Sequence, residues 1–126
     1  MPTRHVVDAG GGVVHHVFEG EVDDAQLTAH QQRLHCELGL EAAFDHLVDV
    51  RGVTRLAVSP EVMWRVAAKS PRGAGFRIAV VVSRGVDFGL SREYAGMAEL
   101  SEERFRIFRD DMAAARRWLG LDDGGG

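Results

Sequence analysis

Charged residues that could bind or position a ligand follow two apolar segments of this chain. Asp49 and Arg51 stand at the end of one segment, and Arg84 and Asp87 follow another. A carboxylate beside a guanidinium can form a strong ion pair, and a polar lead into a helix offers free N–H groups to an anion. For Asp49 and Arg51 two interpretations stay open. They either pair with neighbouring elements and hold the chain in place, or they contact an anion or a partner protein.

Ser59 is followed by Pro60 and Glu61, an order of residues that is typical of a helix opening. The serine oxygen can accept an unpaired N–H of the first turn, and proline suits the first helical position. We therefore expect Ser59 to cap a helix. Phosphorylation of Ser59 is the weaker interpretation, because Glu61 would repel a phosphate.

The histidines and the single cysteine predict no metal site and no nucleophile. His15 and His16 are adjacent in an expected strand, so their side chains point to opposite faces and cannot share an ion. His30 and His35 lie five residues apart on an expected helix, whereas a shared ion needs three or four. His30 falls within an apolar stripe and is expected to be partly buried and hydrogen-bonded. Cys36 and its neighbour His35 diverge by about 100°.

No set of nucleophile, base and orienting group can be assembled from these residues, so we expect a protein without enzymatic activity. No cofactor and no metal is predicted. The net charge of −4 also argues against a nucleic-acid partner, because such binders usually carry a clustered basic face.

Length and composition predict one globular domain. The chain has 126 residues, of which 45% are hydrophobic and 27% charged. One cysteine, no secretion signal and no apolar run of about 18 residues favour a cytoplasmic protein without integral membrane association. We expect the domain to cover residues 1–121 and a flexible, glycine-rich tail to follow at 122–126.

The apolar periodicity predicts an α/β fold with the element order ββαβαβαβα. A mixed, mostly parallel sheet of about five strands should be flanked by four helices, with the first strand antiparallel at an edge. The expected strands are 4–8, 13–20, 44–50, 76–83 and 104–108, and the expected helices are 23–39, 59–70, 86–100 and 110–120.

Three local signals refine this outline. Asp23 with Gln26 is an approximate capping box for the first helix, and Asp110 is the expected cap of the last. Apolar residues on both alternating faces of the segment 13–20 predict a sheet that is covered on both sides. Residues 51–54 are expected in a loop at the carboxyl ends of the strands, where ligands of open α/β sheets gather.

One tryptophan stands out on the second expected helix. Val62, Met63 and Val66 take core-facing positions there, which leaves Trp64 partly exposed. An exposed tryptophan is a suitable contact anchor for a partner protein or for a second copy of the chain, that is, for a homodimer.

Three phrases in a fixed order, "LVDVRGVT" at 47–54, "VVVSRGVDFGLSREY" at 80–94 and "FRIFRDDMAAARRWLG" at 105–120, resemble the SpoIIAA-like family of STAS-type domains. The resemblance covers about residues 13–121. It implies a STAS fold, which is related to that of CRAL-TRIO lipid-transfer domains. Better-understood relatives are anti-sigma-factor antagonists that are switched by phosphorylation of the serine in an Asp-Ser-x-Gly phrase. The equivalent positions here read Ala57, Val58, Ser59 and Pro60, so the aspartate and the glycine of that switch are missing.

The resemblance and the residues together predict a binding or regulatory module that acts through protein–protein contacts. Its candidate contacts are Asp49, Arg51, Ser59, Trp64 and Arg84. The alternative, implied by the lipid-transfer relatives, is a binder of a lipid or another apolar small molecule. Its cleft between helices would be lined by Phe88, Tyr94, Met63 and Trp64.

Overall fold

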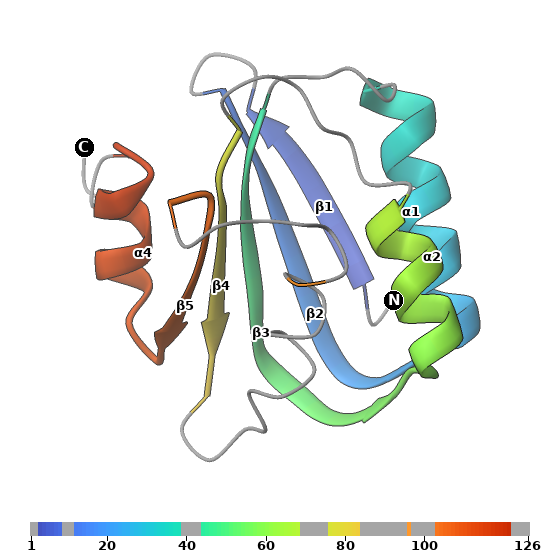
Figure 1. Ribbon diagram of the computed structural model, residues 1–126. Coiled ribbons are helices and arrows are strands. Elements are labelled where there is room, and N and C mark those ends of the chain that lie inside the picture. Colours follow the sequence, from blue (N-terminus) through green and yellow to red (C-terminus); the bar gives the residue numbers. More distant parts are fainter. Residues whose placement is uncertain are drawn as a thin grey trace.

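The computed structural model of this chain describes residues 3–8, 12–38, 44–68, 76–83, 96 and 103–121. Within these residues the chain is an α/β protein with a five-stranded mixed sheet and three helices (Figure 1). In chain order the elements are β1 (Thr3–Asp8), β2 (Val13–Asp23), α1 (Asp24–Leu38), β3 (Asp45–Ala57), α2 (Pro60–Ala68), β4 (Ile78–Val82), β5 (Phe105–Arg109) and α4 (Met112–Trp118).

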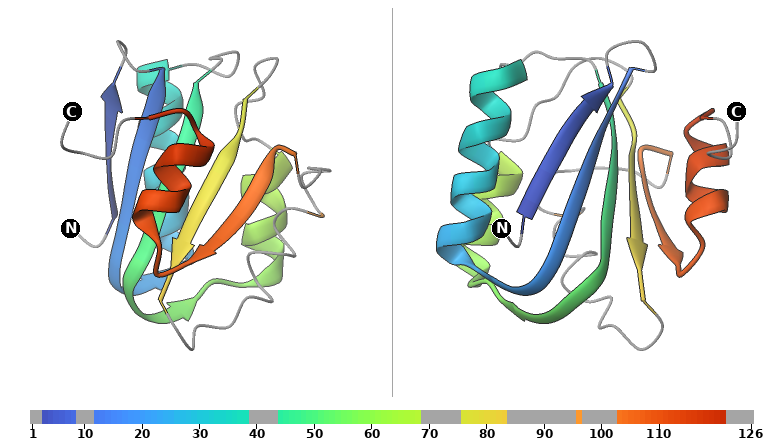
Figure 2. Two further views of the ribbon diagram at one scale, coloured as in Figure 1. Left: turned by 90° about the vertical axis from the view of Figure 1, so that its left-hand side faces the viewer. Right: turned by 180° about the vertical axis from the view of Figure 1, so that it is seen from behind.

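The strands lie in the sheet in the same order as in the sequence, β1-β2-β3-β4-β5. β1 pairs antiparallel with β2 at one edge, and the other three pairings are parallel. The antiparallel edge strand predicted from the sequence is therefore confirmed. α1 and α2 cover one face of the sheet and α4 the other (Figure 2), which confirms the prediction of a sheet covered on both sides.

The face below α4 is apolar and tightly packed. Its buried cluster joins three strands to the helix and consists of Val13, Leu47, Ala79, Val81, Ala115 and Leu119. The end of α4 is also held by Arg77, which donates to the carbonyl oxygens of Trp118 and Leu119 and pairs with Asp45. A cation at this end of the helix complements its dipole.

The opposite face carries two further apolar clusters. β4 is buried along its whole length, and its even-numbered residues pack with Phe76 and Phe105. α1 meets α2 through Leu27 and Val66, against which Phe18, Val58 and Val62 are packed. Gln31 of α1 donates to the carbonyl of Val66 at 2.8 Å, so the two helices form one layer.

The helix starts follow local sequence signals, with one correction. The capping box is confirmed, because the Asp23 side chain accepts from the Gln26 N–H and the Gln26 side chain accepts from the Asp23 N–H, both at 2.9 Å. The predicted cap of α4 was wrong by one residue. Asp111 accepts the Ala114 N–H, whereas Asp110 lies in the turn before it, with φ at +51° and its N–H donated to Val82.

The predicted loop at 51–54 was also wrong, because β3 continues as far as Ala57. The reason lies in β2, which continues to Asp23 and pairs with β3 as far as Ala57. The pairing passes two irregularities and bends toward α1 and α2, as Figure 1 shows. Val22 is fully buried in this extension, which stabilises it.

Two predictions on the later part of the chain fall outside the described residues. These are the helix at 86–100, apart from Gly96, and the tail at 122–126. In the described part of the chain, no helix is long and apolar enough to cross a membrane.

Two leucines of β3 allow a matched test of this core. Leu47 is 1% exposed and Leu56 is 45% exposed. Leu47→Ala should lower the free energy of unfolding by about 2–5 kcal/mol, because it leaves a cavity below α4. Leu56→Ala should change it by less than about 0.5 kcal/mol. Urea denaturation measures both, and equal losses would contradict the assigned register of β3.

Candidate functional site

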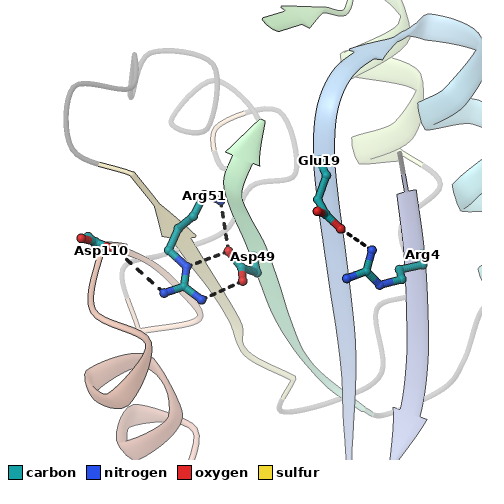
Figure 3. Close-up of polar contacts among 5 residues, drawn as sticks. All are labelled: Arg4, Glu19, Asp49, Arg51 and Asp110. Atoms are coloured by element: carbon teal, nitrogen blue, oxygen red, sulfur yellow. Dashed lines mark hydrogen bonds and ion pairs between the residues drawn. The ribbon is translucent and has the colours of Figure 1, made fainter. Parts of the chain in front are cut away.

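Asp49 and Arg51 form a bidentate ion pair on β3, at the carboxyl end of β4 and β5 (Figure 3). Arg51 donates from Nε to Asp49 Oδ1 at 3.0 Å and from Nη2 to Asp49 Oδ2 at 2.9 Å. The Arg51 N–H also donates to Asp49 Oδ1. On its other side the guanidinium lies 3.9 Å from Asp110, the residue with positive φ that follows β5. The same figure shows the more exposed pair of Arg4 with Glu19 on β1 and β2.

The electrostatics of this pair favour full ionisation. Partial burial alone would raise the pKa of Asp49, but hydrogen bonds from Arg51 outweigh it and lower that pKa. The same hydrogen bonds raise the pKa of Arg51. A carboxylate held in this state is a poor general base at neutral pH. The pair therefore holds the middle of β3 against the turn after β5. Its exposed edge carries both a positive and a negative charge, so a contacting group must tolerate both.

The remaining predicted ligand contacts fall outside the described residues. They are Arg84 and Asp87, proposed for an anion, and Phe88 and Tyr94, proposed for an apolar cleft. The side chain of Met63 also lies outside the description. The structure therefore brings Asp49 and Arg51 together and leaves the other half of the predicted rim as a prediction.

Ser59 caps α2, as predicted. Its Oγ accepts the Val62 N–H at 3.2 Å, and its own N–H donates to Asp24 Oδ1 at 2.7 Å. The carboxylate of Asp24 thus stands beside Ser59, and Glu61 follows in the first turn. Both charges would oppose a phosphate at this position. Phosphorylation of Ser59 remains a weak prediction.

Trp64 is exposed on α2, as predicted. Its exposed fraction is 59%, whereas Val66 on the same helix is 8% exposed. Glu61 and Arg65 lie on either side of Trp64 in the sequence and approach each other to 3.8 Å. The result is an aromatic side chain flanked by a compensated ion pair.

A chain of buried histidines was not predicted from the sequence. His16 of β2 lies between His30 of α1 and His46 of β3, and all three are 3–6% exposed. His16 Nδ1 lies 2.8 Å from His30 Nε2, and His16 Nε2 lies 2.9 Å from His46 Nδ1. We call these three residues the histidine chain. The interpretation of His30 as buried and hydrogen-bonded is confirmed, but its partner was not foreseen.

Burial keeps the histidine chain neutral. It lowers the pKa of His30 and of His46 to about 4 each, and it lowers the pKa of His16 well below its usual value, with help from the neighbouring rings. A fourth ring, His5 of β1, stands at the surface end of the chain, 5.5 Å from the His30 centroid, and contacts Glu37.

The contacts of the histidine chain differ from those of a metal site. Both ring nitrogens of His16 are engaged with different partners, so the lone pairs of the three rings do not converge on one point. Among the described residues, no group of three or more histidine, cysteine, aspartate or glutamate side chains could hold a metal ion. Beside the histidine chain lies a shallow depression of about 610 Å³, lined by His5, Ala29, Gln32, Arg33, Cys36 and Glu37.

Comparison with known proteins gave no match, either to a protein-family model or to a curated protein sequence. The class of protein is therefore stated from the fold alone, an α/β domain with a five-stranded mixed sheet.

The capping role of Ser59 can be measured directly. Ser59→Ala removes the acceptor for the Val62 N–H and should cost about 1 kcal/mol of stability in urea denaturation. Ser59→Asn is the matched control, because asparagine caps as well as serine, and it should remain within about 0.5 kcal/mol of the wild type. An alanine variant as stable as the wild type would contradict the cap.

Stability should depend on pH through the histidine chain. An unfolded histidine has a pKa of 6.5, and in the folded chain that of His30 and of His46 is about 4. The stability that these rings contribute is complete above pH 6.5 and is lost as the pH falls toward 4. The loss amounts to about 3 kcal/mol for each ring as an upper limit. Urea denaturation at pH 7, 6 and 5 measures it, and an unchanged free energy of unfolding would contradict neutral buried rings.

Proposed function

We propose that this chain is a STAS-like binding or regulatory module without enzymatic activity, and that it acts through protein–protein contacts made by α2. The observation that carries the proposal is the exposed indole of Trp64 on a helix that Val62 and Val66 hold against α1. The mixed sheet with its antiparallel edge strand and two-sided helix cover is compatible with a STAS-type domain.

The packing of α2 supports a contact through its outer side. Val62 and Val66 already hold the helix on α1, so Trp64 is not needed to attach it. Tryptophan buries a large surface with little loss of side-chain entropy and is enriched among residues that dominate binding energy. The neighbouring Glu61 and Arg65 compensate each other and would form a polar rim around the indole.

The segment that leads into α2 adds to this surface. Leu56, near the end of β3, is 45% exposed, and it is separated from Trp64 by the capped turn at Ser59. The turn is fixed from both sides, by the Val62 N–H and by Asp24 of α1. A contact surface on a rigid support loses less entropy on binding than one on a mobile loop.

The state of the rim supports a binding role rather than a catalytic one. Asp49 and Arg51 satisfy each other's hydrogen bonds in a bidentate pair, and the pKa of Asp49 is lowered rather than raised toward neutral pH. Catalytic acids and bases usually show the opposite adjustment. We therefore assign the rim pair a structural role in the middle of β3, beside the carboxyl ends of β4 and β5.

Trp64→Ala is the direct test of the contact surface. Wild-type and variant proteins, both immobilised, are incubated with an extract of the native host, and captured proteins are quantified by mass spectrometry. A genuine partner should be captured at least about tenfold less by the variant, since loss of an anchoring tryptophan typically costs 2 kcal/mol or more. Val6→Ala is the control, because Val6 is equally exposed at 63% but lies on β1.

The captured protein is then purified, and its dissociation constant for each variant is measured. Equal capture by wild type and Trp64→Ala, together with an unchanged elution volume in size-exclusion chromatography, would contradict both a foreign partner and a homodimer on this surface. Retained folding of the variants is checked by circular dichroism.

A further inference from the structure

The two contacts of the histidine chain determine where its protons lie. Each of its two contacts joins two ring nitrogens, and a hydrogen bond between nitrogens needs one N–H and one lone pair. A neutral imidazole carries one N–H on two nitrogens. Three neutral rings therefore hold three protons, of which two lie in the contacts and one lies at an end of the chain.

Only two arrangements satisfy both contacts. In the first, all three rings carry the proton on Nε2, and in the second all three carry it on Nδ1. The second places an N–H on His30 Nδ1, which is buried without a hydrogen-bond partner in the described part of the chain. A buried N–H that lacks an acceptor is costly. The structure therefore favours the Nε2–H form of all three rings.

Added protons affect the chain unequally. A fourth proton keeps both contacts, because both ends can then carry an N–H while each contact still has one donor and one acceptor. The N–H on His30 Nδ1 then has no acceptor in the described part of the chain, which makes this proton costly. The charge can be carried by any of the three rings. A fifth proton must bind a nitrogen that already takes part in a contact. That contact then has two N–H groups facing each other and no lone pair, so it breaks.

We propose that the histidine chain is a proton-binding latch between α1 and the sheet, which keeps its contacts with one added proton and releases α1 when a second enters. The contact that opens is the one between His16 and His30. His16 and His46 lie on β2 and β3, which are also joined by a parallel ladder that is regular from Val13 to Val17. His30 is the only member of the chain on a helix.

Some charged groups around the latch oppose a positive charge on its rings, and others favour one. His5 on β1 and Arg33 on α1 oppose a charge on His30, and His5 and His15 oppose one on His16. Asp45 on β3 favours a charge on His46. Glu37 of α1 contacts His5 at the surface. The charge of the first added proton is therefore stabilised best at His46, although the N–H that completes the chain of contacts lies on His30 Nδ1. The second proton must enter one of the two contacts.

α1 is also held on the sheet by Phe18 of β2, which packs against Leu27 and lies 4.8 Å from the His30 ring centre, and by polar contacts at the edge. Arg33 donates to the Thr3 side chain at 2.8 Å, and Glu37 contacts His5, both at the edge strand.

α4, on the opposite face, is held by apolar packing and by Arg77, which keeps its charge in acid. His15 of β2 lies on this face, and partial burial and Arg116 of α4 lower its pKa. Acid should therefore loosen α1 more than α4.

Hydrogen exchange of backbone amides between pH 6.5 and 5 tests the latch on the intact chain. After correction for the intrinsic effect of pH, the protection of α1 amides should fall by well over tenfold and up to about 100-fold per pH unit, because opening takes up two protons. The amides of α4 are the internal control. Their protection should fall by less than tenfold, because the histidine described beside that helix is the single residue His15. A fall of tenfold or less in α1, or equal falls in α1 and α4, would overturn the proposal.

A double variant isolates the titrating rings. His30→Gln and His46→Asn each retain a polar atom close to the nitrogen used in the chain but take up no proton. With only His16 left to titrate, the fall in α1 protection should be about tenfold per pH unit at most. An unchanged slope would assign the effect to other groups and overturn the latch.

Nitrogen NMR of the histidine rings decides the matter independently, and it needs only the wild type. At pH 7 all three rings should show the Nε2–H form. On acidification their nitrogen shifts should first move together, as expected for one shared proton. Three independent titrations near pH 6.5, or an Nδ1–H form of His16, would overturn the latch even if the double variant fails to fold.

Discussion

The arrangement of the α1 face depends on one constraint, which is that three imidazoles removed from water must satisfy one another. His16 meets this constraint by using both ring nitrogens, one toward α1 and one toward β3. A slip of β2 by one residue would turn His16 to the face below α4 and leave His30 and His46 without partners. The polar chain therefore specifies a register that the surrounding valines alone would specify less sharply. Unsatisfied buried groups penalise the alternatives by more than the chain itself gains.

The two faces of the sheet are joined to their helices by different chemistry. Below α4 the contact is apolar, and its polar component is Arg77, whose guanidinium also stacks 5.4 Å from the centre of the Trp118 ring. Below α1 the centre of the contact is titratable, and apolar packing is displaced toward the junction of α1 with α2. The α4 layer is thus less sensitive to pH, since the histidine described on that face, His15, is only partly buried. The other depends on histidines that stay neutral only while they stay buried.

Much of the fold could be predicted because its signals are local. The capping box of Asp23 with Gln26, the cap of Ser59 and the apolar run of β4 each lie within a few residues and are found where the sequence places them. The length of β3 could not be predicted, because the sequence from Arg51 to Leu56 is typical of a loop. It forms a strand because β2 continues and pairs with it. The cap of α4 was misplaced for a similar reason, since the carbonyl of Val82 draws Asp110 into the turn.

The histidine chain escaped prediction because its members are 14 and 30 residues apart and meet only through the sheet. A signal was nevertheless present, since His16 alternates with Val14 and Phe18 on one face and His30 falls in an apolar stripe.

The exposed surface of α2 and the histidine chain belong to the same layer. Gln31 and Leu27 join α1 to α2, and Asp24 of α1 holds the turn before α2 through the N–H of Ser59. A change in how α1 sits on the sheet must therefore reach the support of Trp64. Linkage then acts in both directions. A partner that binds the closed layer would oppose proton uptake by the histidines, and protonated histidines would weaken that partner by the same factor. The coupling requires no signal through the sheet, because the helix that carries His30 is the helix on which α2 rests.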